Sequence, residues 1–191
     1  MIPDTDPFVL FLRHGEREPI PPDEPYADVD LTPAGYAGVA ALGQRLAGRV
    51  AWTAASPFLR CRVTARGLGS EPTDDTRLGT PGPWVVDRTL AAVQFAERTT
   101  EGVVRAQVAG LVLPGMRPAS EAVPLLLSTG IDRINRGSGV CVSHDAVLMP
   151  AMAFLFGAEA AEEWLAPLGG FALYFREGGP VAVWRGRECP C

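Results

Sequence analysis

The most informative stretch of the sequence is residues 8–15, which read FVLFLRHG. Five consecutive apolar residues, without a polar alternation, predict a strand that is covered by helices on both faces. A similar arrangement recurs at residues 139–145, GVCVSHD, where a second apolar run ends in a histidine. His14 and His144 are the only histidines of the chain. Because ligands bind at the carboxyl ends of parallel strands, we expect these two side chains and Ser56, which ends another strand, to converge on one crevice.

Strands alternate with helices along the rest of the chain, which is typical of an α/β fold. We expect a three-layer α/β/α sandwich with a mostly parallel central sheet and a C-terminal antiparallel hairpin, in a single domain over residues 1–191. Besides the two strands above, the patterns predict strands at residues 50–55, 84–86, 171–175 and 181–184. They predict helices at residues 33–48, 58–68, 103–113, 120–129 and directly after His144. Glycines and prolines predict a long connection over residues 67–83.

The composition is that of an ordinary globular protein, with 47% apolar and 20% charged residues. The formal net charge is -5, so no basic field attracts nucleic acid or anionic lipid. All 17 basic residues are arginines, which excludes lysine-based catalysis and favours bidentate contacts with phosphate. No stretch resembles a signal peptide, and the longest uncharged apolar stretch, residues 146–158, is too short to span a bilayer. We therefore expect a cytoplasmic protein without nucleic-acid or membrane partners.

The four cysteines, Cys61, Cys141, Cys189 and Cys191, form no CxxC pair, and the two histidines lie far apart in the sequence. This spacing does not build a zinc site, so we expect no metal and no cofactor. The Cys189-Pro-Cys191 ending is interpreted as a frayed tail without function.

The residues beside the predicted strand ends suit phosphate chemistry. A permanent cation at Arg13 favours the neutral form of the adjacent His14, which keeps one ring nitrogen available for attack on an electrophile. Arg17 and Arg60 are further candidates to surround an oxyanion, and Arg60 lies one turn into a helix whose N-terminus would face the same crevice. The sequence thus indicates a phosphate-binding site around a nucleophilic histidine.

Four segments in order resemble the motifs of the histidine phosphatase superfamily, also called phosphoglycerate mutase-like. Arg13-His14-Gly15 resembles its RHG signature, and residues 31–35, LTPAG, resemble its LTxxG helix start. Residues 56–65, SPFLRCRVTA, resemble its SPxxRAxxTA segment, and residues 142–144 its VSH strand end. The resemblance implies that His14 becomes phosphorylated while Arg13, Arg60 and His144 hold the transferring phosphoryl group, without a metal.

The expected general acid depends on the branch of the superfamily. In the mutase-like branch a glutamate stands where this chain has Ala92. By contrast, RHGEREP at residues 13–19 and His144-Asp145 resemble the RHGxRxP and HD signatures of histidine acid phosphatases, which nominates Asp145 as the acid and Arg17 as a phosphate contact. The chain is much shorter than those enzymes and lacks their inserted cap domain, so a compact hybrid in which Glu16, Glu97 or Glu101 shares the acid role stays open.

These observations predict a metal-independent phosphomonoesterase that acts on a small phosphomonoester through a phosphohistidine. The alternative is a phosphomutase or a repurposed biosynthetic enzyme that uses the same pocket for non-hydrolytic chemistry. A binding module without catalysis is disfavoured, because His14, Arg13, Arg60 and His144 are all present. Residues 1–30 contain eight acids and two arginines. Such a rim disfavours polyanions and favours a substrate whose remainder is neutral or cationic; the natural substrate and the oligomeric state stay open.

Overall fold

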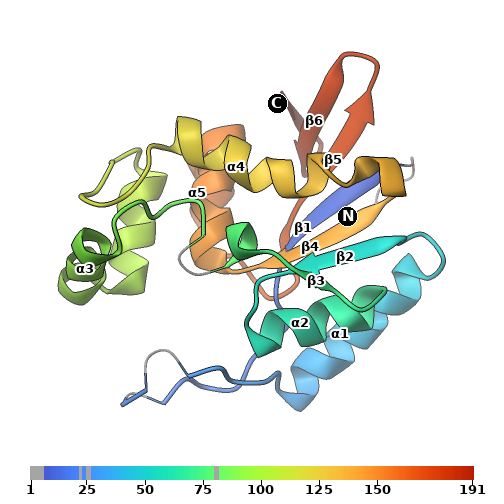
Figure 1. Cartoon of the computed structure of the whole chain (residues 1–191), viewed down its shortest axis with the longest axis horizontal. Coiled ribbons are helices and arrows are strands. Elements are labelled where there is room, and N and C mark those ends of the chain that lie inside the picture. Colours follow the sequence, from blue (N-terminus) through green and yellow to red (C-terminus); the bar gives the residue numbers. More distant parts are fainter. Residues whose placement is uncertain (1–6, 22, 25–26, 80–81) are drawn as a thin grey trace.

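The computed structural model describes residues 7–21, 23–24, 27–79 and 82–191. Its centre is a seven-stranded sheet with strand order β3-β2-β4-β1-β5-β6-β7 (Figure 1). Strands β1 to β4 pair in parallel, and β5 to β7 continue the sheet in antiparallel fashion. The strands are β1 (Phe8–Arg13), β2 (Trp52–Ala55), β3 (Thr73–Asp74), β4 (Gly139–Ser143), β5 (Gly170–Arg176), β6 (Gly179–Trp184) and β7 (Arg187–Pro190).

Helices cover both faces of the sheet, as the unbroken apolar runs predicted. The helices are α1 (Pro33–Leu46), α2 (Leu59–Leu68), α3 (Arg88–Val108), α4 (Ala119–Ile131) and α5 (Asp145–Phe156), with short 3₁₀ helices η1 (Thr76–Leu78), η2 (Ile134–Arg136) and η3 (Ala158–Ala161). In β1, Leu10 and Leu12 belong to the core under α1 and α2, whereas Val9 and Phe11 belong to the core under α4 and α5. Helix α3 lies beyond α5, away from the sheet (Figure 1). The expected three-layer α/β/α fold is confirmed.

Local signals explain where these elements begin and end. Helix α1 starts because the Thr32 hydroxyl accepts the Gly35 N–H at 2.9 Å and Pro33 occupies the first turn. Helix α3 is interrupted at Thr99, where a backbone φ of 62° breaks the helical path. Helix α5 is buried on nearly all sides, which accounts for its almost continuous apolar sequence.

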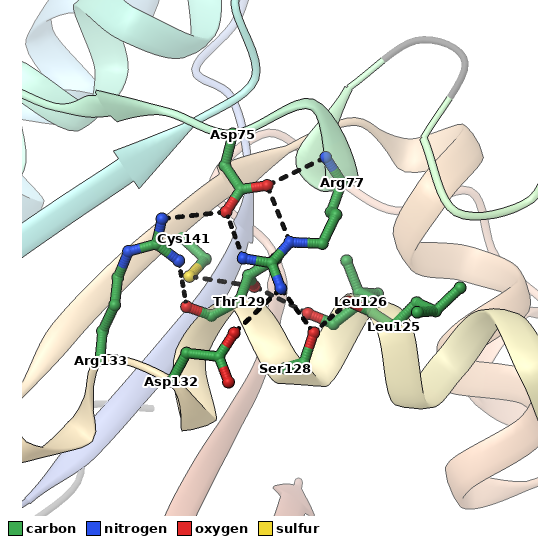
Figure 2. A network of polar contacts seen from close by, with 9 residues as sticks. All are labelled: Asp75, Arg77, Leu125, Leu126, Ser128, Thr129, Asp132, Arg133 and Cys141. Carbon is green, nitrogen blue, oxygen red and sulfur yellow. Dashed lines mark hydrogen bonds and ion pairs between the residues drawn. The ribbon is translucent and has the colours of Figure 1, made fainter.

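An ion-pair network ties the edge of the sheet to α4 (Figure 2). The Asp75 carboxylate, 7% exposed, accepts from Arg77 at 2.8 Å and pairs with Arg133 at 3.0 Å. Arg77 also donates to Ser128 and Asp132 on α4 and just after it. Burial alone would raise the pKa of Asp75, but its hydrogen bonds with Arg77 and the charge of Arg77 outweigh burial and lower it. The network fixes η1, whose Leu78 carbonyl accepts the Ser143 hydroxyl at 2.6 Å directly before His144.

Three expectations from the sequence are wrong. Residues 84–86 form no strand; Val85 makes a single bridge with Met116, because the Trp84 side chain turns into the core and donates to the Val147 carbonyl at 3.0 Å. The helix expected at residues 103–113 is the second half of α3, which starts at Arg88 and ends at Val108. The frayed tail is strand β7, which pairs with β6, and its cysteines are free thiols.

The connection predicted over residues 67–83 contains the end of α2 and two further elements, the short strand β3 and η1. Over the described part of the chain, no helix has both the length and the apolar character needed to cross a membrane.

Candidate active site

His14 lies one residue beyond β1, and its backbone N–H donates to the Ser143 carbonyl at 3.0 Å. Its ring is 5.4 Å from that of His144, between centroids. Ser56 lies one residue beyond β2, and its backbone N–H donates to the Val142 carbonyl at 3.0 Å. The parallel pairing of β1, β4 and β2 therefore brings the three strand ends together, as expected from the sequence.

The tautomer of His14 follows from one contact. Its Nδ1 lies 2.7 Å from the Gly15 carbonyl oxygen, which can only accept, so Nδ1 carries the proton and Nε2 the lone pair. The residue is 3% exposed. Burial, assisted by the charges of Arg60 and Arg13, lowers the pKa of His14 to about 4, although the bond to Gly15 acts in the opposite direction. His14 is thus a neutral imidazole with a free nitrogen at neutral pH.

His144 is held between a hydroxyl and a guanidinium. Its Nε2 lies 2.9 Å from the Ser56 Oγ, and its Nδ1 lies 3.5 Å from Arg60 Nη2. Because an arginine can only donate, Nδ1 accepts and Nε2 carries the proton in the neutral ring. Burial lowers the pKa of His144 well below its usual value, and the charge of Arg60 acts in the same direction. The Phe58 ring packs against His144 edge-on, 5.4 Å between centroids, and lies 4.4 Å from the Arg60 guanidinium carbon.

Arg13 is fixed by contacts with Asp145 and Leu165. One terminal nitrogen pairs with Asp145 Oδ2 at 2.8 Å and the other donates to the Leu165 carbonyl. Asp145 Oδ2 also accepts from the Trp164 indole at 2.8 Å, and Oδ1 accepts from the Ala146 N–H at 2.8 Å. All three donors point at carboxylate oxygens. These contacts hold the Asp145 carboxylate in a fixed orientation beside Arg13.

Three guanidinium nitrogens of the site are buried without a hydrogen-bond partner among the described residues. They are Nε of Arg13 and both Nε and Nη1 of Arg60. Buried donors of this kind cost free energy unless a ligand accepts from them. An oxyanion between Arg13 and Arg60 would satisfy them, which matches the phosphate role that the sequence assigned to these arginines.

The other candidates take different places. Arg17 is half-buried in the loop after β1, and its Nη1 donates to the Glu18 carbonyl at 2.8 Å. Its charge lowers the pKa of Arg13 after larger effects from burial and Asp145, which places it at the rim of the site. Glu16 is exposed and accepts from the Thr32 hydroxyl at 3.0 Å.

Glu97 and Glu101 are exposed on α3, where Glu101 lies 3.8 Å from Arg105. Of the four acids considered, Asp145 alone has a described contact with Arg13, His14, Arg60 or His144.

Positioning contacts that sequence reasoning missed lie within the quoted motifs. The Thr64 hydroxyl accepts the Gly15 N–H at 2.9 Å and donates to the Arg60 carbonyl at 2.7 Å, which joins α2 to the loop of His14. A Cβ on Gly35 would lie 2.0 Å from the Glu16 carbonyl oxygen, so only glycine lets α1 approach this loop. Gly15, Gly35 and Thr64 belong to the quoted motifs, so the motifs could have indicated these contacts. Trp164 and Leu165 lie outside every motif.

Neither a metal centre nor a reactive thiol lies beside the two histidines in the described part of the chain. No cluster of three or more His, Cys, Asp or Glu side chains there could hold a metal ion. Cys61 Sγ is 3.6 Å from His144 Nε2, but burial raises the pKa of the thiol to about 12, so it is not a nucleophile at neutral pH. A groove of about 820 Å³ lies between α1 and residues 159–170, and none of the residues proposed for catalysis lines it.

Comparison with known proteins agrees with this geometry. Residues 9–80, which contain three of the four motifs, match the family model of the histidine phosphatase superfamily (branch 1). The superfamily expected from the sequence is confirmed. The matched model is that of branch 1, and the likeness to the histidine acid phosphatases rests on the short RHGxRxP and HD signatures. No curated protein matches the chain.

Solved structures share the fold along nearly the whole chain. A phosphoserine phosphatase variant from Entamoeba histolytica, in complex with phosphoserine, superposes with a TM-score of 0.64 at 18% identity over 93% of this chain and 95% of that one. A mycobacterial glucosyl-3-phosphoglycerate phosphatase does so with a TM-score of 0.57 at 16% identity over 96% and 99%. Residues 9–80 of this chain are thus similar to the histidine phosphatase superfamily, and its fold is that of these solved phosphatases along nearly the whole chain.

Proposed function

We propose that the protein hydrolyses a small phosphomonoester by passing the phosphoryl group through Nε2 of His14. The observation that carries this proposal is the hydrogen bond from His14 Nδ1 to the Gly15 carbonyl, because it leaves a lone pair on Nε2 of a neutral, buried ring. Arg13 and Arg60 supply donors for the equatorial oxygens, and phosphoryl transfer depends mainly on such positioning and charge stabilisation.

The reaction has two displacements. In the first, Nε2 of His14 attacks phosphorus, the ester P–O bond breaks, and the leaving alcohol oxygen takes a proton from Asp145. In the second, water attacks the phosphorus, the P–N bond breaks, the water proton passes to Asp145, and inorganic phosphate leaves. His144, neutral and fixed by Ser56, donates toward the transferring group when its Nε2–H turns from the hydroxyl.

Asp145 is the proposed acid because it is the candidate in contact with Arg13. Phosphate bound to Arg13 competes with the carboxylate for the same guanidinium, which would free Oδ2 to carry the proton. A positioned acid of this kind contributes roughly 10²- to 10⁴-fold. The proposed substrates are small phosphomonoesters, since the solved relatives bind phosphoserine and 3-phosphoglyceric acid.

A leaving-group test separates catalysis by Asp145 from positioning of Arg13. We would measure kcat/KM of the wild type and of Asp145→Asn for p-nitrophenyl phosphate and for an alkyl phosphate, with chelator present. A nitrophenolate leaves readily without a proton, whereas an alkoxide does not. We expect Asp145→Asn to lose about 10²-fold or more on the alkyl ester and much less on the nitrophenyl ester. Equal losses on both would show that Asp145 acts only through Arg13.

The phosphohistidine itself is tested by rapid quenching with a ³²P-labelled substrate. Label should stay on the protein in base and leave it in acid, because a P–N bond is stable in base and labile in acid. His14→Ala should show neither label nor turnover, whereas His144→Ala serves as a matched control that retains the nucleophile. Hydrolysis that persists in His14→Ala would refute the mechanism.

A further inference from the structure

A carboxylate outside the family motifs reaches the arginine that is proposed to hold phosphate. Asp28 Oδ1 lies 3.9 Å from Nη1 of Arg60, and the side chains are 50% and 9% exposed, respectively. The same oxygen accepts the backbone N–H of Leu59 at 2.7 Å. Asp28 belongs to the loop between β1 and α1, whose described parts extend past the carboxyl ends of the strands, at the same end of the sheet as α3 (Figure 1).

Two features hold Asp28 in this place. The residue before α2 is Phe58, whose side chain cannot cap the helix, so the Asp28 carboxylate takes over the first N–H of α2. A negative charge at a helix N-terminus is also favoured by the helix dipole. The ends of the loop are joined by backbone pairing, since the Thr32 N–H donates to the Glu16 carbonyl at 3.0 Å and the Glu18 N–H donates to the Asp30 carbonyl at 2.9 Å.

Asp28 places a negative charge beside the arginine that is proposed to hold the phosphoryl group. Arg60 faces His144 with Nη2 and Asp28 with Nη1, so a phosphoryl group held by Arg60 lies close to a fixed carboxylate. Residues 16–31 contain six acids and one arginine, Arg17, so the surrounding rim adds to the negative field. A second anion on the substrate is repelled there, whereas an ammonium group is attracted.

We propose that Asp28 is a specificity-determining residue that selects phosphomonoesters whose alcohol carries an ammonium group and rejects those that carry a second anionic group. This inference rests on the proposed phosphatase function of the same site. Two unit charges about 6 Å apart near a protein surface change a rate constant roughly tenfold or more.

The experiment compares three probes that differ in the charge of the alcohol. We would measure kcat/KM for phosphoethanolamine, p-nitrophenyl phosphate and 3-phosphoglycerate with wild type, Asp28→Asn and Asp30→Asn. Asparagine at position 28 keeps an oxygen that can accept the Leu59 N–H, so the cap of α2 is retained. Asp30 is the matched control, because it loses the same charge from the same loop but contacts the Tyr36 hydroxyl instead of Arg60.

The wild type should prefer phosphoethanolamine to 3-phosphoglycerate, and Asp28→Asn should shift that preference by about tenfold toward 3-phosphoglycerate. Asp30→Asn should shift it by less than about threefold. An unchanged ratio in Asp28→Asn, or an equal shift in both variants, would overturn the proposal while turnover of p-nitrophenyl phosphate leaves the phosphatase function standing. If no probe is turned over, the phosphatase function fails instead, and calorimetric affinities for the two charged probes decide the role of Asp28 by the same ratio.

Discussion

Removing the imidazole of His14 should make the stability of the protein less dependent on pH. The pKa of His14 is about 4 in the folded protein and about 6.5 in an unfolded chain. Between these values the unfolded state binds more protons than the folded state, so the free energy of unfolding falls as the pH falls from about 6.5 toward 4. The contribution of His14 is fully present above pH 6.5.

The magnitude follows from the same two values. At pH 5 an unfolded histidine is almost fully protonated while His14 is almost fully neutral, which costs about 2 kcal/mol relative to pH 8. His14→Asn is the suitable variant, since its amide can donate to the Gly15 carbonyl as the ring Nδ1 does. The smaller side chain lowers stability at every pH, but that loss is constant and leaves the slope as the readout.

Urea unfolding followed by tryptophan fluorescence at pH 5, 6, 7 and 8 provides the measurement. The wild type should lose about 2 kcal/mol more than His14→Asn between pH 8 and pH 5. His144 and the carboxylates remain in both proteins, and His14→Asn/His144→Asn compared with His144→Asn checks that the difference arises from His14 and not from its effect on the neighbouring ring. Parallel curves for the two proteins would mean that the folded His14 titrates at its ordinary pKa, and the argument from burial would be refuted.

Two further predictions concern the fold. Gly139→Ala should lower the free energy of unfolding by about 3 kcal/mol, since the added Cβ would lie 2.1 Å from the Trp52 ring in the core. Gly178→Ala, with open space around it, should change the free energy of unfolding by less than about 0.5 kcal/mol. Similar losses for the two variants in urea titrations would contradict the packing of Gly139 against Trp52. Asp75→Asn should lower the free energy of unfolding by about 3 kcal/mol, because it leaves Arg77 and Arg133 without their buried carboxylate. Replacing the exposed Asp132 by asparagine should lower it by less than about 1 kcal/mol in the same assay. A reversed order would show that the network in Figure 2 does not stabilise the edge of the sheet.

The strands that carry His14 and His144 could be predicted because they are buried on both faces. A central strand of an α/β sheet has no solvent face, so its sequence is an uninterrupted apolar run that ends sharply at the first polar residue. The apolar run quoted from Gly139 up to His144 is strand β4. Parallel pairing then requires their polar ends to meet, which is why two histidines 130 positions apart could be placed together from the sequence.

Contacts made by residues in loops could not be predicted from a pattern in the sequence. Trp164 donates to Asp145, and the Leu165 carbonyl accepts from Arg13, but both residues lie in an irregular segment whose path depends on the finished sheet. Asp28 looked like one acid among many in a proline-rich loop. Trp84 and its neighbours looked like a strand because large apolar residues fill strands and packed loops equally well. Periodicity reports burial, and it does not report which partner covers the buried group.

The two arginines beside the histidines lower the stability of the folded chain. Arg13 and Arg60 are 16% and 9% exposed, and three of their nitrogens are buried without a hydrogen-bond partner among the described residues. Each such donor costs about 1–3 kcal/mol, although Asp145 and Asp28 lie close to the charges of the two guanidinium groups. The folded chain therefore contains a site that is unfavourable until an anion binds. The unpaired donors do not stabilise the fold. This is the physical reason to interpret these residues as a binding site for a phosphoryl group rather than as part of the core.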